Sequence, residues 1–109
     1  MAFDLGLAAR IREELTGLPG LQEKKMFGGV GFILFGNMAC GVLESDLIVR
    51  VGSENSAQAL QKPFARPFDS YGKPMSGWAL VAPPGYAAVE DLKAWVWQGI
   101  DFARTLPPK

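Results

Sequence analysis

Hydrophobic residues recur at helical spacing near both ends of the chain. Close to the N-terminus, Phe3, Leu7, Ile11 and Leu15 follow one another at four-residue intervals, which predicts an amphipathic helix over residues 3–17. Close to the C-terminus, a second and stronger pattern predicts a helix over residues 88–106. The apolar residues that produce this second pattern are Val89, Leu92, Val96, Ile100 and Ala103.

Short apolar runs between these two helices predict β-strands. Residues 30–35, 38–43 and 47–51 are rich in strand-forming residues, and tight connections between them predict an antiparallel meander. We expect Gly36-Asn37 to form the first connection, because a two-residue hairpin loop needs positive φ angles. Glu44-Ser45-Asp46 is the expected second turn, and residues 77–82 predict a further strand.

The middle of the chain gives weaker signals. Residues 53–61 predict a short helix capped by Ser53, and residues 62–76 are expected to be irregular because they contain three prolines. Together, the elements predict one α+β domain over residues 1–109. The expected architecture is a two-layer sandwich, with an antiparallel sheet of about four to five strands and helices at the N- and C-terminal ends.

The composition narrows the function classes. Eleven basic and eleven acidic residues cancel, whereas a protein that binds nucleic acid directly is usually basic. The chain has no histidine and one cysteine, Cys40, so the most common acid–base residue and metal ligand is missing. The N-terminal sequence has neither the pattern of a signal peptide nor that of a membrane span. We therefore expect a cytoplasmic protein that does not associate with membranes.

Four glycines lie in the segment KKMFGGVGFILFG, residues 24–36. A dinucleotide-binding fingerprint would need a third correctly spaced glycine and a helix after the strand. Here Gly29-Val30-Gly31 leads into another apolar strand. Because glycine leaves space on one face of a strand, we interpret these glycines as packing residues and expect no cofactor.

Two motifs resemble a known family. Met26-Phe27-Gly28-Gly29 is followed about forty residues later by a segment that begins at Arg66-Pro67 and continues to Gly77. In combination they are similar to the N-terminal domain of the TfoX/Sxy family, over residues 5–106. The matching residues of the second segment are Arg66, Pro67, Gly72, Lys73, Pro74, Met75 and Gly77.

The resemblance implies an α+β fold similar in shape to secretion chaperones. Full-length members are regulators of natural competence that act with a transcription factor, the cyclic-AMP receptor protein, rather than by reading DNA alone. They also carry a second, helical C-terminal domain. This chain ends at Lys109, so we expect a stand-alone version of the N-terminal domain. The family supplies no catalytic residues to transfer.

Two sets of residues are candidate binding sites. Arg50, Lys62, Arg66 and Lys73, together with neighbouring aromatic residues, could form an anion-binding or partner-binding patch, or they could be separate solvated charges. Trp97 falls among charged residues of the C-terminal helix. It is either an interface residue or a side chain covered by its own chain. Cys40 is expected to be a buried apolar residue rather than a nucleophile.

The leading hypothesis is a non-enzymatic regulatory module that acts through protein contacts and could form a homodimer. The first alternative is a nucleic-acid-binding or nucleotide-binding accessory domain that uses the basic patch. A small enzyme is a distant third hypothesis, because the sequence contains no histidine.

Overall fold

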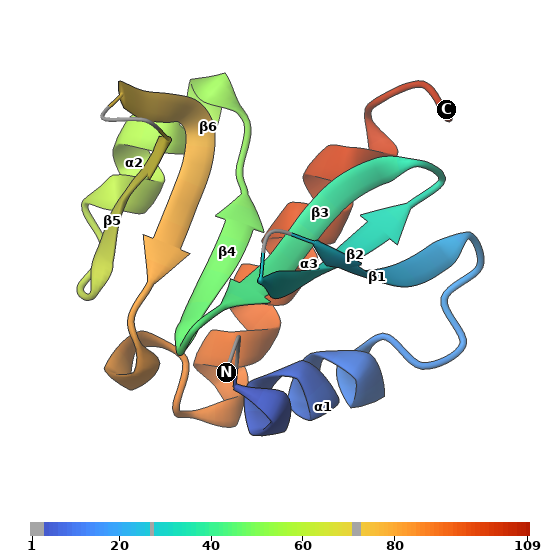
Figure 1. Ribbon diagram of the computed structural model, residues 1–109. Helices are drawn as coiled ribbons and strands as arrows, with labels where there is room; N and C mark the ends of the chain where they lie inside the picture. The colour runs from blue at the N-terminus through green and yellow to red at the C-terminus, as the bar shows by residue number, and fades with distance from the viewer. Residues whose placement is uncertain (1–3, 27, 71–72) are drawn as a thin grey trace.

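A computed structural model describes residues 4–26, 28–70 and 73–109, with the description of Met26 and of residues 69–70 and 73–75 limited to the backbone. Its helices lie at the two chain ends and between the strands (Figure 1). They are α1 (Leu5–Glu14), α2 (Ser56–Leu60) and α3 (Val89–Arg104), with short 3-10 turns η1 (Ser53–Asn55) and η2 (Pro83–Gly85). The strands are β1 (Leu21–Met26), β2 (Gly29–Leu34), β3 (Asn37–Leu43), β4 (Asp46–Arg50), β5 (Ala65–Ser70) and β6 (Lys73–Val81).

The described part of the chain forms one open sheet of six strands in the order β1-β2-β3-β4-β6-β5. All neighbouring strands are antiparallel. Helix α3 packs against β2, β3 and β4, while α1 contacts β3 and α2 contacts β5 and β6. The predicted α+β architecture with helices at both ends is therefore confirmed, and the sheet has six strands where about four to five were expected.

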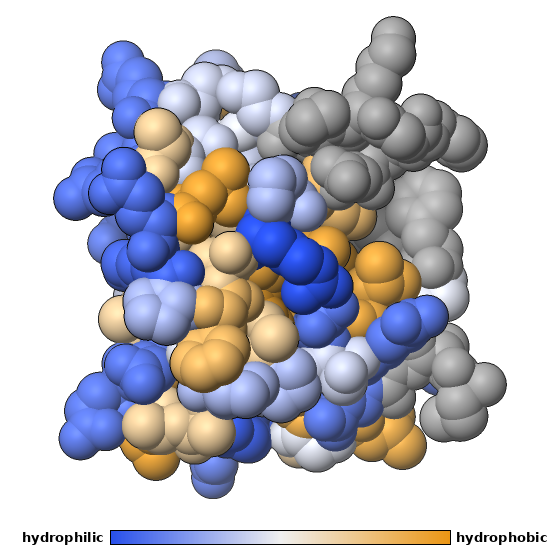
Figure 2. Space-filling view, turned by 90° about the vertical axis from the view of Figure 1, so that its left-hand side faces the viewer, coloured by the Kyte–Doolittle hydropathy of each residue, from blue (hydrophilic) through white to orange (hydrophobic). Residues whose placement is uncertain are grey.

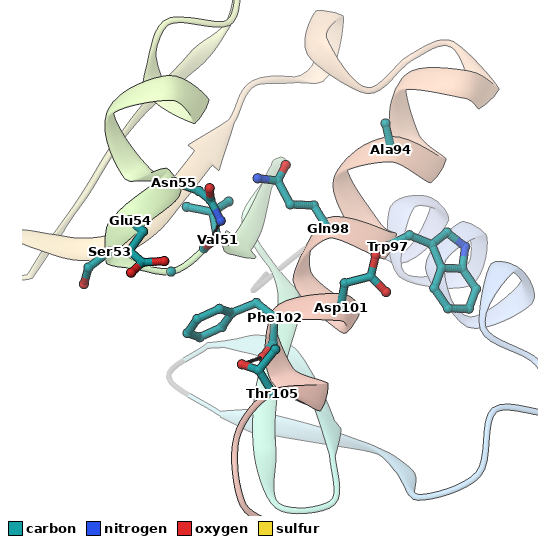
Figure 3. A pocket seen from close by; sticks show the side chains of 11 residues that line it. Val51, Ser53, Glu54, Asn55, Ala94, Trp97, Gln98, Asp101, Phe102 and Thr105 are labelled. Atoms are coloured by element: carbon teal, nitrogen blue, oxygen red, sulfur yellow. Dashed lines mark hydrogen bonds between the residues drawn. The ribbon is translucent and has the colours of Figure 1, made fainter.

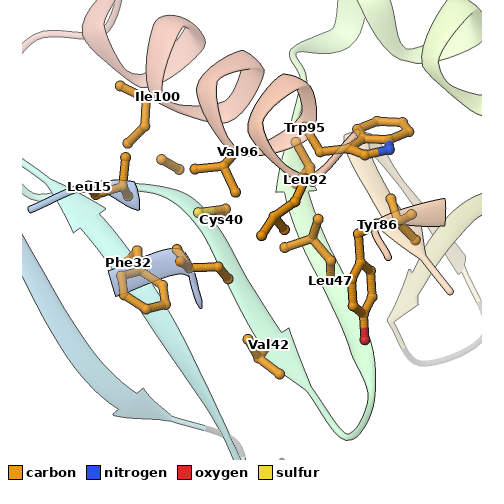
Figure 4. Packing of buried hydrophobic residues seen from close by; sticks show 14 of the residues in the cluster. Leu15, Phe32, Cys40, Val42, Leu47, Tyr86, Leu92, Trp95, Val96 and Ile100 are labelled. Carbon is orange, nitrogen blue, oxygen red and sulfur yellow. The ribbon is translucent and has the colours of Figure 1, made fainter. Parts of the chain in front are cut away.

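The core lies between α3 and the inner face of the sheet (Figure 4). Side chains alternate along β2, so that Val30, Phe32 and Leu34 are all buried. From the helix, the predicted apolar stripe meets them through Leu92, Val96 and Ile100, which are also buried. Among the described residues, no helix is both long enough and apolar enough to cross a membrane.

Helix α1 is shorter than the predicted helix over residues 3–17. Asp4 is its N-cap, and the carboxylate oxygen Oδ1 accepts hydrogen bonds from the backbone N–H groups of Gly6 and Leu7. Because a capping side chain satisfies N–H groups that the helix itself leaves free, the first helical residue is Leu5. Residues 1–3 of the prediction lie outside the described part of the chain.

Strands β1 and β5 were not predicted as separate strands, and both lie at the edges of the sheet. Among the described β1 side chains, Leu21 packs against the core and the other four are polar. A bidentate pair between Arg12 and Glu23, at 2.7 and 2.6 Å, joins the strand to α1. Hydrogen bonding from Arg12 lowers the pKa of the Glu23 carboxyl. Strand β5 contains Pro67, which an edge strand tolerates. The expectation that residues 62–76 are irregular is therefore wrong for residues 65–70 and 73–76, which belong to β5 and β6.

The first predicted turn is displaced by one residue. Leu34 pairs with Asn37, so Phe35 and Gly36 form the connection, with φ angles of 49° and 87°. Both central residues of such a hairpin turn need positive φ. Asn37 belongs instead to β3, where its buried side-chain amide donates to the Pro107 carbonyl oxygen. In the second turn Leu43 pairs with Asp46, so Asp46 already belongs to β4.

The predicted cap at Ser53 is also wrong. The 3-10 turn that begins at Ser53 is preceded by Gly52 and has no side-chain cap. The Ser53 hydroxyl instead lies 3.2 Å from the Ser76 hydroxyl, from which it accepts a hydrogen bond. The cap position is occupied by glycine because the backbone there has a φ of 88°, which favours glycine over serine.

The glycines of the β2–β3 hairpin pack backbone against backbone. A Cβ atom on Gly29 would overlap the Val42 carbonyl oxygen, and one on Gly41 would lie 2.5 Å from the Val30 carbonyl oxygen. Strand β2 continues through a tight turn into antiparallel β3 rather than into a helix. The packing interpretation is therefore confirmed for Gly29, whereas Gly28 and Gly36 lie in turns with positive φ angles.

Helix α3 lies close to the sheet at Gly99, where an added Cβ would overlap the Ala39 carbonyl oxygen. We predict that Gly99→Ala lowers the free energy of unfolding by about 1–3 kcal/mol, because the helix must move away from β3. The matched substitution Gly6→Ala in α1, where the nearest atom is the flexible Asp4 carboxylate, should instead be neutral or raise stability by up to about 1 kcal/mol. Urea unfolding of both variants measures the difference, and a stabilised Gly99→Ala would contradict the packing.

Candidate functional site

A groove of about 850 Å³ lies between η1 and the outer face of α3 (Figure 3). One rim consists of the turn at residues 52–55, and the other consists of α3 residues that point away from the core. The groove is open to solvent along its length, and its lining combines polar side chains with the aromatic rings of Trp97 and Phe102. Two other cavities among the described residues are smaller, at about 260 and 320 Å³.

Backbone hydrogen bonds hold the η1 rim in place. The N–H groups of Val51 and Gly52 both donate to the Gly77 carbonyl oxygen, at 2.8 and 3.0 Å. Gly52 and Gly77 have φ angles of 88° and 89°, which favour glycine. A Cβ on Gly52 would lie 2.6 Å from the Phe102 ring, and a Cβ on Gly77 would lie 3.1 Å from the Ser53 nitrogen. The rim therefore depends on close contacts that only glycine allows.

Helical periodicity explains which residues form the opposite rim. Gln98, Asp101 and Thr105 are three and four residues apart, so they share the face of α3 that is turned away from the sheet. The Thr105 hydroxyl donates to the Phe102 carbonyl oxygen at 2.6 Å. In Figure 3, Gln98 points across the groove towards η1.

Phe102 joins the groove to the end of the sheet. Its ring lines the groove and also contacts the Arg50 guanidinium, whose Cζ lies 5.5 Å from the ring centroid. The same guanidinium lies 5.2 Å from the Trp78 ring and donates to the Met38 carbonyl oxygen at 3.4 Å. Arg50 is thus held between two aromatic rings, an arrangement that stabilises a cation.

The charged side chains that line the groove are both acidic. Glu54 projects from η1 and Asp101 from α3, and both residues are exposed. Asp101 also pairs with Arg104 of the same helix at 3.4 Å. Within the described part of the chain, no group of three or more His, Cys, Asp or Glu side chains is arranged to hold a metal ion.

Three of the four predicted patch residues engage different partners within the chain. Lys62 lies over the Trp95 ring of α3, with its Nζ 4.7 Å from the ring centroid. Arg66 of β5 forms an ion pair with Asp46 of β4 at 2.5 Å. The Lys73 side chain lies outside the part of the chain that the structure describes. Figure 2 shows the side of the molecule that carries α2 and β5, where apolar and hydrophilic residues are interspersed. The structure therefore gives Arg50, Lys62 and Arg66 separate intramolecular contacts rather than one shared site.

Trp97 is half-buried and connects α3 to α1. Its indole Nε1 donates to the Glu14 carboxylate at 2.7 Å, and the Arg104 guanidinium lies 5.6 Å from its ring centroid. It also forms one end of the groove. The side chain therefore has a structural contact within its own chain, while its role at an interface stays a prediction.

Cys40 lies in β3 and is completely buried. Burial raises the pKa of its thiol to about 12, which keeps the thiol protonated at physiological pH. The sequence-based expectation of a buried apolar residue is confirmed.

Comparison with protein-family models gives a match to the TfoX N-terminal domain over residues 13–103. The chain belongs to the TfoX N-terminal domain family. Searches of curated proteins and of solved structures found no match.

Several family-motif residues of this TfoX N-terminal domain have clear structural roles. Gly28 has a φ of 76° directly before β2, and Gly29 allows the close approach of β3. Arg66 forms the ion pair with Asp46, while Pro67 pairs with Ala79 within edge strand β5. Gly77 accepts the two hydrogen bonds that hold the η1 rim. Phe27 and Gly72 lie outside the described residues, as do the side chains of Met26, Pro74 and Met75.

The polar residues of the groove were not predicted from the sequence. Glu54 and Asn55 are separated from Gln98 and Asp101 by about forty residues, and no spacing pattern connects them. The only available signal was the polar face of the C-terminal helix, which indicated solvent exposure and not a groove.

We predict that Trp97 and Glu14 are energetically coupled. Trp97→Phe removes the indole donor and should lower the free energy of unfolding by about 0.5–1.5 kcal/mol. A double-mutant cycle with Glu14→Ala, measured by urea unfolding, should give a coupling energy of the same order. Additive effects of the two substitutions would show that the hydrogen bond contributes nothing, and size-exclusion chromatography of the Trp97→Phe variant tests the interface hypothesis.

We predict that Cys40 does not react with thiol reagents in the folded protein. Because the thiol is buried and its pKa is raised to about 12, labelling at neutral to mildly alkaline pH should require unfolding. The labelling rate should therefore rise with urea in parallel with the unfolded fraction. Rapid labelling of the native protein would show that β3 is accessible.

Proposed function

We propose that this TfoX N-terminal domain is a cytoplasmic regulatory module that binds a partner protein, with the groove between η1 and α3 as its binding surface. The observation that carries the proposal is the groove itself. It is open to solvent and combines polar side chains with Phe102 and Trp97, and its two rims are held by the contacts of Gly52 and Gly77 and by the packing of α3. A preorganised surface of this kind reduces the entropy lost on binding.

The distribution of charge favours a protein partner over a nucleic acid. Binding to a phosphate backbone needs several cations on one surface. Lys62 contacts the Trp95 ring of α3, whereas Arg66 is paired with Asp46 of β4. These two cations therefore have different partners within the chain. The groove presents carboxylates, which would repel phosphate groups.

Binding is also favoured over catalysis. The carboxylates in the groove, Glu54 and Asp101, are exposed, whereas catalytic carboxylates are typically placed where burial or a close neighbour changes their pKa. The only thiol in the chain belongs to Cys40, which is buried in the core. Family membership supports a regulatory role, because the resemblance to TfoX implies proteins that act alongside a transcription factor. Formation of a homodimer stays a prediction.

The proposal predicts that filling the groove weakens partner binding. Tagged full-length chain would first be used to identify a partner from native lysate, and the interaction would then be measured with both purified proteins by calorimetry. Gln98→Trp, which places a large ring in the groove, should weaken the affinity by at least about tenfold. Lys93→Trp places the same ring on exposed α3 surface outside the groove and should bind like the original chain.

Circular dichroism and thermal unfolding establish that both variants are folded before binding is compared. If Gln98→Trp binds the purified partner as tightly as the original chain, the groove is not the binding surface and the proposal fails.

A further inference from the structure

The ionisable side chains in the groove carry charge of one sign on two opposite rims. Glu54 belongs to η1 and Asp101 to α3, so a cation between them would be attracted from both sides. Arg104 is the cation that pairs with Asp101, at 3.4 Å, and both side chains are at least half exposed. An exposed pair of this kind is weak and can be exchanged for another cation. Arg50 contacts Phe102 but does not line the groove.

The hydrogen bonds within the rims also favour a ligand group that donates hydrogen bonds. The Asn55 side-chain amide nitrogen donates to the Val51 carbonyl oxygen at 3.1 Å, which leaves its oxygen available as an acceptor. The Thr105 hydroxyl uses its proton on the Phe102 carbonyl oxygen, so only its lone pairs remain. Asn55 and Thr105 therefore add free acceptors to the two carboxylates, while the Gln98 amide offers both donor and acceptor groups. The ligand groups that match this arrangement carry several N–H donors, as the side chains of arginine and lysine do.

The apolar part of the groove suits the remainder of such a side chain. The Phe102 ring lies between the two acidic rims. The methylene groups of arginine and lysine pack well against such apolar surface while the charged head stays in a polar environment. A negatively charged segment would be repelled by the carboxylates on both rims.

From these observations we infer that the groove selects a basic segment of the partner protein, with an arginine or lysine side chain placed between Glu54 and Asp101 and its methylene groups on Phe102. This inference rests on the proposed function, because it names the chemistry of the partner at the same groove. It also excludes an acidic segment and a nucleic acid as occupants of this surface.

The test uses short fluorescent synthetic peptides that differ only at one central residue, which is arginine, lysine, glutamine or glutamate. Binding to the full chain would be measured by fluorescence anisotropy at low and high salt. The arginine and lysine peptides should bind at least about tenfold more tightly than the glutamine peptide at low salt, and the difference should shrink as salt rises. The glutamate peptide should bind most weakly.

Matched variants assign the preference to the groove. The double variant Glu54→Gln/Asp101→Asn should lose the preference for basic peptides. Glu13→Gln/Glu90→Gln removes two exposed carboxylates outside the groove and should retain it. Circular dichroism confirms that both double variants fold.

The outcomes separate this inference from the proposed function. If the peptides show no basic preference, or if both double variants lose it equally, the inference is overturned. In that case the proposed function still stands provided that Gln98→Trp weakens binding of the purified partner. If Gln98→Trp leaves partner binding unchanged, the proposed function fails whatever the peptides show.

Discussion

At Gly99 the backbone of α3 comes so close to β3 that no side chain fits between them. This contact brings Leu92, Val96 and Ile100 of the helix into the core above the central strands. The same helix carries the polar residues of the groove on its opposite face. One close approach between helix and sheet therefore sets both the depth of the core and the position of the α3 rim. A closely packed protein interior does not deform gradually, so the two are fixed together.

Much of the fold could be predicted from the sequence because the central elements bury one face and expose the other. The apolar stripe of α3 and the apolar runs of β2, β3 and β4 follow directly from that requirement. The edge strands did not give this signal. Of the β1 side chains that the structure describes, Leu21 packs against the core and the other four, at positions 22–25, are polar. Strand β5 contains Pro67, which reads as a strand breaker unless its position at an edge is known.

The candidate site was much harder to predict. A groove depends on which segments lie side by side, and here η1 comes near α3 through hydrogen bonds to Gly77, a residue from a third part of the chain. Trp97 interrupts the charged face of the predicted helix, which made it a candidate interface residue. Its contact with Glu14 of α1 could not be predicted from the sequence of that helix alone. Arg50 and Arg66 attracted attention as cations, whereas the structure shows that aromatic rings and Asp46 engage them.

The η1 turn has a consequence for how such domains diversify. Its path is determined by backbone hydrogen bonds and by the glycines at positions 52 and 77, while the Glu54 side chain is exposed. Evolution or protein engineering can therefore replace Glu54 with little effect on folding. The backbone can stay the same while the side chains at one rim change. Related domains with the same backbone therefore need not recognise the same molecules.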